Sequence, residues 1–449
     1  MMILWLFTAI FYVFGSLASI KAQLQPPTIS LLQPQGIRFV IQDYPGATLA
    51  AVHYSINRPL VGSDAGEHNY DINEKTDNAW VHENRNIIVN AGDVVNYWIY
   101  VVINGVGQHL TDQSWTAPGR GGSEWNLVFE DNFDTLDTTN KWDYEVTASG
   151  GGNWEFQVYT PEQQNTFVRN GNLVIKPTLT ADRFGEDFLY NGILDLREMY
   201  GRCTDERDYG CRREGRNGMI NSIMSGKLKS RQAFRYGRME FRAKMPTGDW
   251  IWPALWLLPR DAVYGGWPRS GEIDVCESRG NENYGSIGVQ EFGATLHWGP
   301  EPAQNRWTMT QGKRHCPGCT YGQDFHIYRL DWDETGLMVF ENGNLVLNVP
   351  TPSEGYYNWG GCTGPNPWEG QGTDAPFNRE FYLILNVAVG GTNGYFPDNV
   401  QSLPYPKPWS NNSPQANEDF WNGRSGWYST WRGDDVAMEV DYVRVWQRN

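Results

Sequence analysis

A continuous apolar run, Ile3 to Ile20, opens the chain, and short apolar and polar stretches alternate between turn residues after it. Lys21-Ala22-Gln23 follows the run, and a small residue such as Ala22 is typical of a signal-peptide cleavage site. We predict that residues 1–22 are a signal peptide and that the mature chain begins near residue 23. The run is also long enough to span a bilayer, so an uncleaved anchor is the alternative. Either interpretation implies export.

Residues 23–115 read as short β-strands separated by turn signals. The predicted strands are 36–41, 50–54, 86–89 and 94–103. Asn104-Gly105 directly follows the last of them and is typical of a tight hairpin turn. The spacing predicts a small Ig-like β-sandwich over residues 23–115. The segment 116–123, TAPGRGGS, has the composition of a linker.

Residues 124–449 show apolar and polar residues in strict alternation over several segments. The clearest are 238–245, 438–446 and parts of 381–389. A period of two is typical of a strand with one buried face. Many such strands, with almost no helical pattern, predict an all-β fold in which a large β-jelly-roll (concanavalin-like) sandwich follows the small one. Its concave sheet would supply a cleft for a polysaccharide.

The charge and the aromatic content point to a neutral partner. With 36 basic and 52 acidic residues the net charge is -16, which opposes contact with nucleic acid or an anionic lipid surface. Aromatic residues make up 14% of the chain and include 21 Trp. Such rings suit the apolar faces of sugars, so a neutral polysaccharide is the expected ligand.

Six cysteines in an exported chain indicate disulfides. Cys203 and Cys211 bracket a charged loop and form the predicted pair. Cys276 lies inside a predicted strand, where a buried free thiol is expected, and a second thiol is then left over. Cys316 and Cys319 form a CxxC motif that suggests zinc as an alternative, although the sequence offers no second cluster of ligands.

The segment GEIDVCESRGN carries three acids within six residues: Glu272, Asp274 and Glu277. Glycoside hydrolysis requires two carboxyl groups. Strict alternation would place residues 272, 274 and 276 on one face of a strand and turn Glu277 to the other. The three acids converge only if a β-bulge inserts one extra residue after Asp274, and we predict that bulge.

A retaining mechanism then gives each acid a role. We assign Glu272 as the nucleophile and Glu277 as the acid/base. Asp274 between them would hold a proton or a hydrogen bond, because clustered carboxylates do not all ionise at ordinary cost. The alternative is a solvated acidic strand face, since ExDxxE arises by chance in about one chain in ten of this length.

The text around these acids resembles glycoside hydrolase family 16. From about Trp125 to the C-terminus, the segments GRMEFRAKMPTGDWIWPALWLLP, GGWPRSGEIDVCESRGN, GATLHWG, DFHIYRLDWDETGLMVFENG, LNVAVGG and MEVDYVRVW resemble its β-1,3-glucanases, the laminarinases. In that family the ExDxxE form with its bulge marks the laminarinase-like branch. The resemblance implies an endo-acting, retaining β-1,3-glucanase and the same three roles for Glu272, Asp274 and Glu277.

The N-terminal part is similar to the β-glucan-binding module, family 39, of invertebrate β-1,3-glucan recognition proteins, also called Gram-negative bacteria-binding proteins. NAWVHENRN and AGDVVNYWIYVV carry this resemblance. It implies that Trp80, Arg85 and Asp43 contact glucan; for Trp80 a half-buried sandwich aromatic is the alternative. Many relatives with this layout have lost the catalytic glutamates and act only as immune receptors. Both glutamates are present here, which favours hydrolysis.

Five further residues are candidates for the substrate cleft. Trp252 and Trp256 share a predicted strand face and would either stack on sugars or pack in the core, and Trp267 is a third candidate for stacking. His297 resembles a cleft histidine of the family that could bond a sugar hydroxyl, with a structural role as the alternative. Asn386 faces either the cleft or its strand neighbours.

Asn411 begins the glycosylation sequon Asn411-Asn412-Ser413, which the following Pro414 disfavours. The proposed chemistry needs no metal and no organic cofactor, and the resemblance leaves a structural Ca²⁺ open. We expect a secreted monomer that binds β-1,3-glucan, with no nucleic-acid partner and no membrane contact once the signal peptide is removed. A glucan receptor without turnover and a transglycosylase are the alternative functions.

Overall fold

The computed structural model describes residues 24–32, 36–76, 79–87, 89, 93–117 and 125–448. The predicted signal peptide and residues 118–123 of the predicted linker lie outside these ranges. The chain divides into two compact units, residues 1–122 and 123–449, which are considered separately below. Within the described ranges, no helix has both the length and the apolar character needed to cross a membrane.

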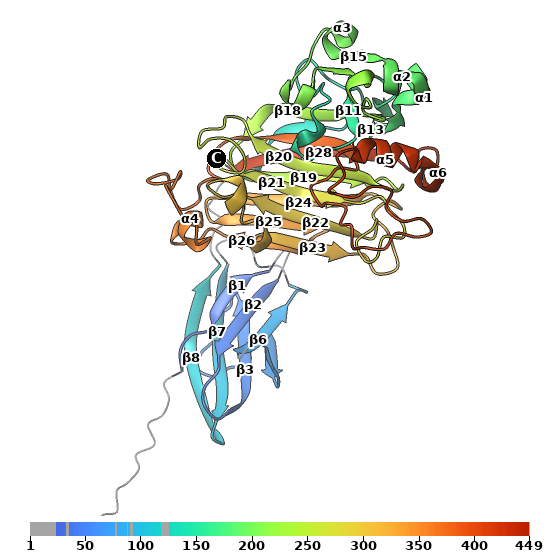
Figure 1. Ribbon diagram of the computed structural model, residues 1–449. Helices are drawn as coiled ribbons and strands as arrows, with labels where there is room; N and C mark the ends of the chain where they lie inside the picture. The colour runs from blue at the N-terminus through green and yellow to red at the C-terminus, as the bar shows by residue number, and fades with distance from the viewer. Residues whose placement is uncertain are drawn as a thin grey trace, which may run out of the picture. The chain divides into compact units, whose positions relative to one another are not determined.

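The first unit is a sandwich of two four-stranded antiparallel sheets (Figure 1). One sheet has the order β1(Thr28–Leu31)-β2(Ile37–Gln42)-β6(Ala79–Asn84)-β5(Lys75–Thr76). The other has the order β4(His68–Ile72)-β3(Ala47–Ile56)-β7(Val94–Ile103)-β8(Val106–Thr116). Phe39 and Ile41 from the first sheet share a core with Val52, Ile99 and Val101 from the second. The predicted β-sandwich is therefore present.

The hairpin prediction is confirmed at Asn104-Gly105. Both residues have positive φ, 51° and 78°, as a tight turn between β7 and β8 requires. The predicted strand at 86–89 is wrong for the described residues 86, 87 and 89. The backbone N–H of Asn86 donates to the side chain of Asn84, which turns the chain out of the sheet as β6 ends. Ile87 and Val89 are apolar because they pack against the core without pairing.

The second unit is built on two large antiparallel sheets packed face to face, as the sequence predicts. The seven-stranded sheet has the order β10(Trp142–Tyr144)-β18(Lys227–Phe234)-β27(Phe381–Val389)-β20(Ile251–Pro259)-β21(Glu272–Ser278)-β22(Glu291–His297)-β23(Gln311–His315). The eight-stranded sheet has the order β12(Thr166–Arg169)-β13(Asn172–Ile175)-β28(Met438–Arg448)-β19(Gly237–Lys244)-β24(His326–Asp333)-β25(Gly336–Glu341)-β26(Asn344–Pro350), and β9(Trp125–Asp131) also pairs with β28. This is the predicted all-β jelly-roll sandwich.

The strict alternation of the sequence is visible in the burial of this unit. Along β19 every second side chain, including Met239, Phe241 and Ala243, is buried in the core between the sheets. From the seven-stranded sheet, β21 and β27 contribute side chains such as Ile273 and Leu385 to the same core. Residues on the other face of that sheet are free to form a site.

The second unit also contains short helices and two small sheets. The helices differ from the prediction, because the sequence pattern predicts almost no helix. The described helices are α1(Thr180–Phe184), α2(Glu186–Asn191), α3(Leu196–Tyr200), α4(Gly355–Trp359), α5(Ala416–Asn422) and α6(Arg424–Trp427), with 3-10 turns at 150–152, 207–209, 215–217, 302–304, 307–309 and 428–430. The small sheets are β11(Gln157–Tyr159)-β17(Ile223–Ser225)-β14(Thr178–Leu179) and β15(Ile193–Asp195)-β16(Arg212–Glu214). Helices of four to seven residues are too short to show a helical period in the sequence.

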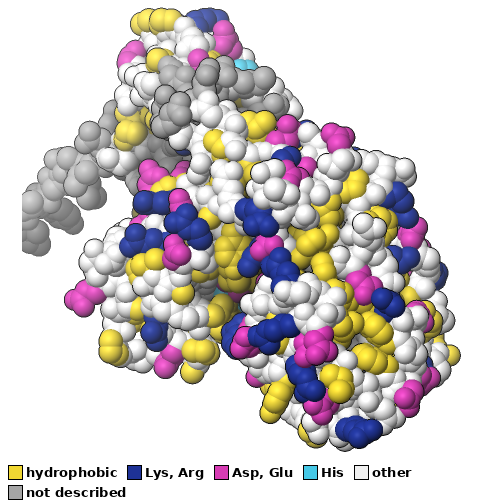
Figure 2. All heavy atoms as spheres, turned by 90° about the horizontal axis from the view of Figure 1, so that it is seen from above, with side chains coloured by type: hydrophobic (Ala, Val, Ile, Leu, Met, Phe, Trp, Pro, Cys, Tyr) yellow, Lys and Arg dark blue, Asp and Glu magenta, His cyan; other side chains and the backbone are white. Residues whose placement is uncertain are grey.

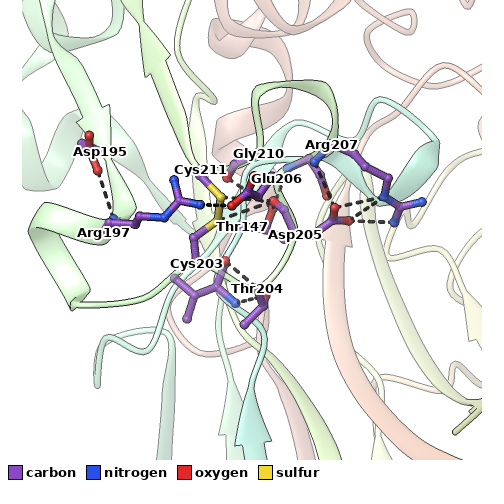
Figure 3. The surroundings of a disulfide bond; sticks show 12 residues. Thr147, Asp195, Arg197, Cys203, Thr204, Asp205, Glu206, Arg207, Gly210 and Cys211 are labelled. Carbon is purple, nitrogen blue, oxygen red and sulfur yellow. Dashed lines mark hydrogen bonds and ion pairs between the residues drawn. A yellow bond between two sulfur atoms is a disulfide. The ribbon is translucent and has the colours of Figure 1, made fainter. Parts of the chain in front are cut away.

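The predicted Cys203–Cys211 disulfide is present and closes the charged loop (Figure 3). Inside this loop Arg207 pairs with Asp205, and the Asp205 carbonyl accepts from the Thr147 hydroxyl at 2.8 Å. Cys316 and Cys319 form a second disulfide, so the CxxC motif does not offer zinc two thiolates. Cys276 is a buried free thiol as predicted, and Cys362 is the second free cysteine of the described residues.

Figure 2 shows how charge is distributed over one face of the molecule. On the face in Figure 2, basic side chains (dark blue) and acidic side chains (magenta) lie among one another and do not gather by sign. The net charge of -16 therefore does not appear on this face as one acidic patch.

Candidate active site

A β-bulge in β21 brings the three acids to one face of the seven-stranded sheet. Asp274 pairs with Thr295 of β22 and Glu277 with Gly293, so two residues of β21 stand opposite one residue of β22. The two residues of the bulge, Val275 and Cys276, both point into the core, and one of them is extra relative to β22. Glu277 consequently returns to the face that carries Glu272 and Asp274. The bulge predicted from the spacing of the acids is confirmed.

His297, at the end of β22, stands beside two of these acids. It pairs in register with Glu272, and its Nε2 lies 3.8 Å from Glu272 Oε1 and 3.3 Å from Asp274 Oδ2. Asp274 is almost completely buried, whereas Glu272 and Glu277 are only partly covered. The two glutamates are therefore the acids that a ligand can reach.

The proton on His297 can be placed from its neighbour Asn305. The Asn305 Oδ1 accepts from the backbone N–H groups of Trp298 and Trp307, which leaves its Nδ2 to donate to His297 Nδ1 at 2.8 Å. Nδ1 is thus an acceptor, and the ring proton is on Nε2, facing the carboxylates. Glu272, Asp274 and His297 offer donor atoms within 4.8 Å of one another, a set that could hold a cation. With its proton on Nε2, His297 points an N–H and not a lone pair toward the carboxylates, which does not suit it as a metal ligand in this form.

Burial raises the pKa of all three acids. It raises the pKa of Glu272 to about 8, with the nearby Asp274 as the second cause. Burial, then Glu277, holds the pKa of Asp274 well above its usual range, and burial also raises that of Glu277. The group therefore retains protons at neutral pH. Asp274 is the most deeply buried of the three, so its charged form is the most costly to desolvate.

This arrangement predicts a stability cost that grows with pH. A carboxyl whose pKa is raised on folding stabilises the folded protein fully at pH values below its unfolded pKa, which is near 4.5 for Glu272. This stabilisation is lost as the pH rises through the folded pKa of about 8. The loss is at most about 5 kcal/mol. We expect Glu272→Gln, which cannot ionise, to lose less thermal stability than wild type between pH 5 and pH 8.5. Calorimetry at both pH values measures this for wild type, Glu272→Gln and the exposed control Glu334→Gln. Equal changes of melting temperature with pH in wild type and Glu272→Gln would contradict the prediction.

Trp252 and Trp256 both lie on the acid-bearing face of β20 but are held differently. Trp252 is only 7% exposed, and its Nε1 donates to Glu277 Oε1 at 2.9 Å. Trp256 is half-buried, and its Nε1 donates to Asn386 Oδ1 at 2.6 Å. The Asn386 amide in turn donates to Tyr159 Oη, so both of its ends are satisfied by neighbours. These residues shape the acid-bearing face more than they expose rings to a ligand.

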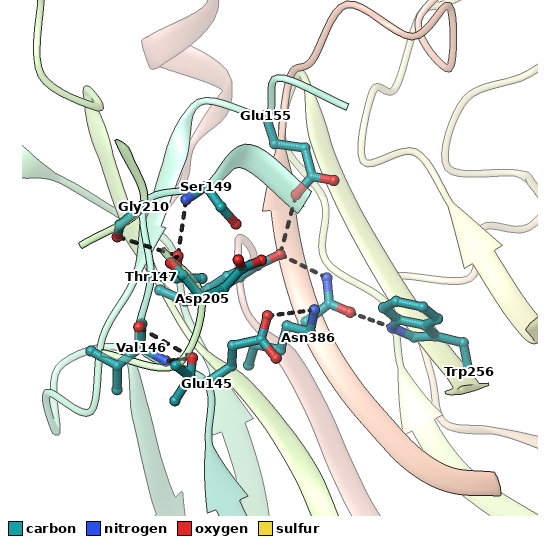
Figure 4. A network of polar contacts seen from close by, with 12 residues as sticks. Glu145, Val146, Thr147, Ser149, Glu155, Asp205, Gly210, Trp256 and Asn386 are labelled. Carbon is teal, nitrogen blue, oxygen red and sulfur yellow. Dashed lines mark hydrogen bonds and ion pairs between the residues drawn. The ribbon is translucent and has the colours of Figure 1, made fainter. Parts of the chain in front are cut away.

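The contacts of Asn386 extend into a buried polar network that sequence reasoning missed (Figure 4). Tyr159 and Gln157 on β11 both donate to Glu155, at 3.4 and 2.6 Å. Burial raises the pKa of Glu155. Lys227 lies 5.0 Å from the Trp256 ring centre and pairs with Glu145 at 3.0 Å. In the sequence this network corresponds to the segment GNWEFQVYT, which is rich in polar and aromatic residues. Their spacing indicates no particular chemistry, so the network could not be predicted.

Exposed tryptophans stand beside the acids. Trp267 is 48% exposed, hydrogen-bonds Glu272 and lies 5.6 Å from the His297 ring, centre to centre. Trp307, 39% exposed, lies 6.3 Å from the same ring on a 3-10 turn. Trp154 is also exposed and precedes Glu155. Sequence reasoning identified Trp267 but missed Trp307 and Trp154, because neither lies on a strand with a readable period.

Known families and proteins are similar in sequence to both parts of this chain. Residues 20–141 match the carbohydrate-binding domain CBM39, described as family 32, and residues 197–358 match the glycosyl hydrolases of family 16. A β-1,3-glucan-binding protein of Penaeus monodon is 49% identical over 72% of this chain and 90% of its own length. The chain belongs to the family of the β-1,3-glucan-binding proteins.

Two further relatives have names that indicate different functions. β-1,3-glucan-binding protein 1 of Galleria mellonella is 29% identical over 94% of this chain and 96% of its own length. Glucan endo-1,3-beta-glucosidase A1 of Niallia circulans is 35% identical over 72% of this chain and 38% of its own length. The similarities thus include proteins named for binding and a protein named for hydrolysis.

In the first unit, the three residues predicted to contact glucan differ in exposure. Trp80 is 2% exposed, belongs to the sandwich core and donates from Nε1 to Asp43 at 3.2 Å. Asp43 also pairs with Lys75 at 2.9 Å, and Lys75 lowers the pKa of Asp43. Arg85 is exposed just beyond β6 and pairs with Glu83 at 3.1 Å. Of the three, Arg85 is the side chain most accessible to a ligand.

Because Trp80 is a core residue, we expect its substitution to act through stability. Trp80→Ala should destabilise the first unit by about 3 to 5 kcal/mol, whereas Trp80→Phe, which keeps a ring in the core, should cost less and still bind laminarin. Calorimetry and laminarin-binding assays on the full chain measure both effects. A Trp80→Phe protein that folds like wild type but no longer binds would show instead that the indole contacts glucan.

Asn411, the predicted glycosylation residue, has a side chain that is already in use. Its Nδ2 donates to the Phe396 carbonyl at 3.0 Å, and its Oδ1 accepts from Lys407 at 2.8 Å. A glycan replaces one of the two Nδ2 hydrogens, so only the other could keep the bond to Phe396. In its unmodified state Asn411 links the Phe396 carbonyl to Lys407.

Proposed function

We propose that this β-1,3-glucan-binding family member is an exported endo-β-1,3-glucanase that hydrolyses laminarin-type glucans with retention. The observation that carries the proposal is the bulge at Val275 and Cys276, which places Glu277 on the same face as Glu272. A retaining glycosidase needs both groups on one face, one as the nucleophile and one as the acid/base. A chain that only bound glucan would have no use for two ligand-accessible carboxyl groups around a buried third.

In the proposed reaction, Glu272 attacks the anomeric carbon while Glu277 donates a proton to the glycosidic oxygen, whose bond to that carbon breaks. Water then gives a proton to Glu277 and displaces the sugar from Glu272. Asp274, whose burial disfavours its charged form, takes no part in bond making. Trp267 and Trp307 offer exposed rings on which sugar units of the chain can stack.

Support for export comes from the apolar run of residues 3–20 and from the two disulfides, which persist in oxidising compartments. Support for glucan as the ligand comes from the carbohydrate-binding domain and from the names of the relatives. Several of those names also favour a second candidate, a glucan-binding protein without turnover. A β-glucan transglycosylase, which would use the same covalent intermediate, is the third.

Release of reducing ends from laminarin, mixed-linkage β-glucan and agar, assayed side by side, tests the proposal. We expect release from laminarin, less or none from mixed-linkage glucan, and none from agar. Binding of laminarin without release of reducing ends would favour the second candidate. Oligosaccharides longer than the substrate, formed at high substrate concentration, would favour the third.

A further inference from the structure

The proposed acid/base, Glu277, receives a hydrogen bond from one indole. Trp252 lies on β20, two residues before Ala254, which pairs with Glu277 across the two strands. Its Nε1 donates to Glu277 Oε1 at 2.9 Å. An indole N–H can only donate, so Oε1 must accept. A proton on Glu277 is therefore directed to the other oxygen, Oε2.

The Trp252 indole is itself held by a second ring. Tyr395 stacks on it with ring centres 3.9 Å apart and planes 6° from parallel. Tyr395 lies in the loop that follows β27, more than one hundred residues beyond Trp252. Phe396 adds an edge contact to Trp252 at 6.5 Å. The orientation of the indole thus depends on where this loop sits.

An arginine from the catalytic segment fixes that loop. Arg279 follows Glu277 by two residues, and its guanidinium lies 3.9 Å from the centre of the Tyr395 ring. Its Nε and Nη2 both donate to the Tyr395 carbonyl, at 2.8 and 2.6 Å. One side chain therefore clamps both the ring and the backbone of Tyr395. Arg279 and Glu277 lie on the same segment. Through Arg279, this segment holds the loop of Tyr395, and Tyr395 orients the indole that donates to Glu277.

We propose that Arg279, Tyr395 and Trp252 form a positioning stack that fixes the carboxyl of Glu277, so that Oε2 carries its proton toward the leaving oxygen. This inference rests on the proposed function, because only a hydrolase or a transglycosylase needs an oriented acid at this position. The three side chains touch Glu277 or one another, and none is assigned a part in bond making. They are positioning residues.

The Tyr395 hydroxyl takes no part in the positioning stack, so the ring can be tested apart from it. Tyr395 Oη is buried without a hydrogen-bond partner in the described part of the chain, so its removal breaks no hydrogen bond. The contacts to Trp252 and Arg279 come from the ring and the backbone. Tyr395→Phe should therefore preserve the stack, whereas Tyr395→Leu should remove it.

Aryl β-glycosides of a β-1,3-linked glucose disaccharide separate acid catalysis from the other steps. A 2,4-dinitrophenolate leaves without being protonated, whereas a phenolate leaves well only with an acid to help it. We expect Tyr395→Leu and Trp252→Phe to lower kcat/KM about 10- to 100-fold for the phenyl glycoside and less than about 3-fold for the dinitrophenyl glycoside. Tyr395→Phe should restore the wild-type ratio of the two rates, and Tyr209→Leu, at an exposed tyrosine, is the control.

The outcomes separate this inference from the proposed function. A wild-type chain that cleaves neither glycoside would overturn both. A wild-type chain that cleaves both, with variants that lose the two activities equally or lose neither, would overturn the positioning stack alone. If Tyr395→Leu does not fold, as judged by calorimetry, Trp252→Phe gives the same test because it removes the N–H donor and keeps a ring beside Tyr395.

Discussion

Glu272→Gln should lower the rate of laminarin hydrolysis by at least about 10,000-fold while laminarin binding changes by only a few fold. An amide has the shape of the carboxyl but cannot attack the anomeric carbon, so the first bond does not form. The neighbouring His297 Nε2 lies 3.8 Å from Glu272 Oε1 and makes no hydrogen bond that the amide would lose. The site should therefore keep its geometry.

Reducing-end assays and calorimetric titration with laminarin measure the two quantities for Glu272→Gln. Glu334→Gln makes the same chemical change at an exposed turn residue and should match wild type in both. Equal turnover by wild type and Glu272→Gln would rule out Glu272 as the nucleophile. Loss of binding together with turnover would mean that the substitution disturbs the acid-bearing face.

Glu277→Ala should slow laminarin hydrolysis about 1,000-fold but spare the first step on a dinitrophenyl glycoside, whose leaving group needs no proton. The glycosyl-enzyme then accumulates, because no base is left to activate water. Added azide is already an anion and fits the space left by the side chain. We expect azide to restore turnover and to give the β-glycosyl azide.

Product analysis by NMR and the dependence of the rate on azide concentration check this second prediction. Asp274→Ala is not an equivalent change, because it removes a buried acid whose own pKa is raised by burial and by the nearby Glu277. An α-glycosyl azide would assign Glu277 as the nucleophile instead. No response to azide, with turnover still lost, would mean that Glu277 acts through structure and not through proton transfer.

The acid-bearing strand shows how far the sequence can be read. Alternation alone placed Glu277 on the wrong face, and only the chemical need for two carboxyl groups on one face predicted the bulge. The structure provides it at Val275 and Cys276 because both side chains are apolar and fit the core. Here local pattern and chemistry together were sufficient.

Contacts between distant segments could not be read in the same way. Alternation placed Trp252 and Trp256 on one face of a strand, yet the cover over Trp252 is Tyr395, from a loop with no regular pattern. The Cys203–Cys211 pair was accessible because its cysteines are close in sequence. Trp80 illustrates a third limit: the alternation of β6 assigns it to one face but does not say that this face is the core.

The stereochemistry of the first product tests the central claim most directly. Proton NMR of laminarin hydrolysis, recorded before the sugar anomers equilibrate, shows which anomer forms first. Two carboxyl groups on one face, with Glu272 as the nucleophile, predict the β-anomer, since two inversions at the anomeric carbon give retention. Appearance of the α-anomer first, or binding of laminarin with no product, would contradict the account.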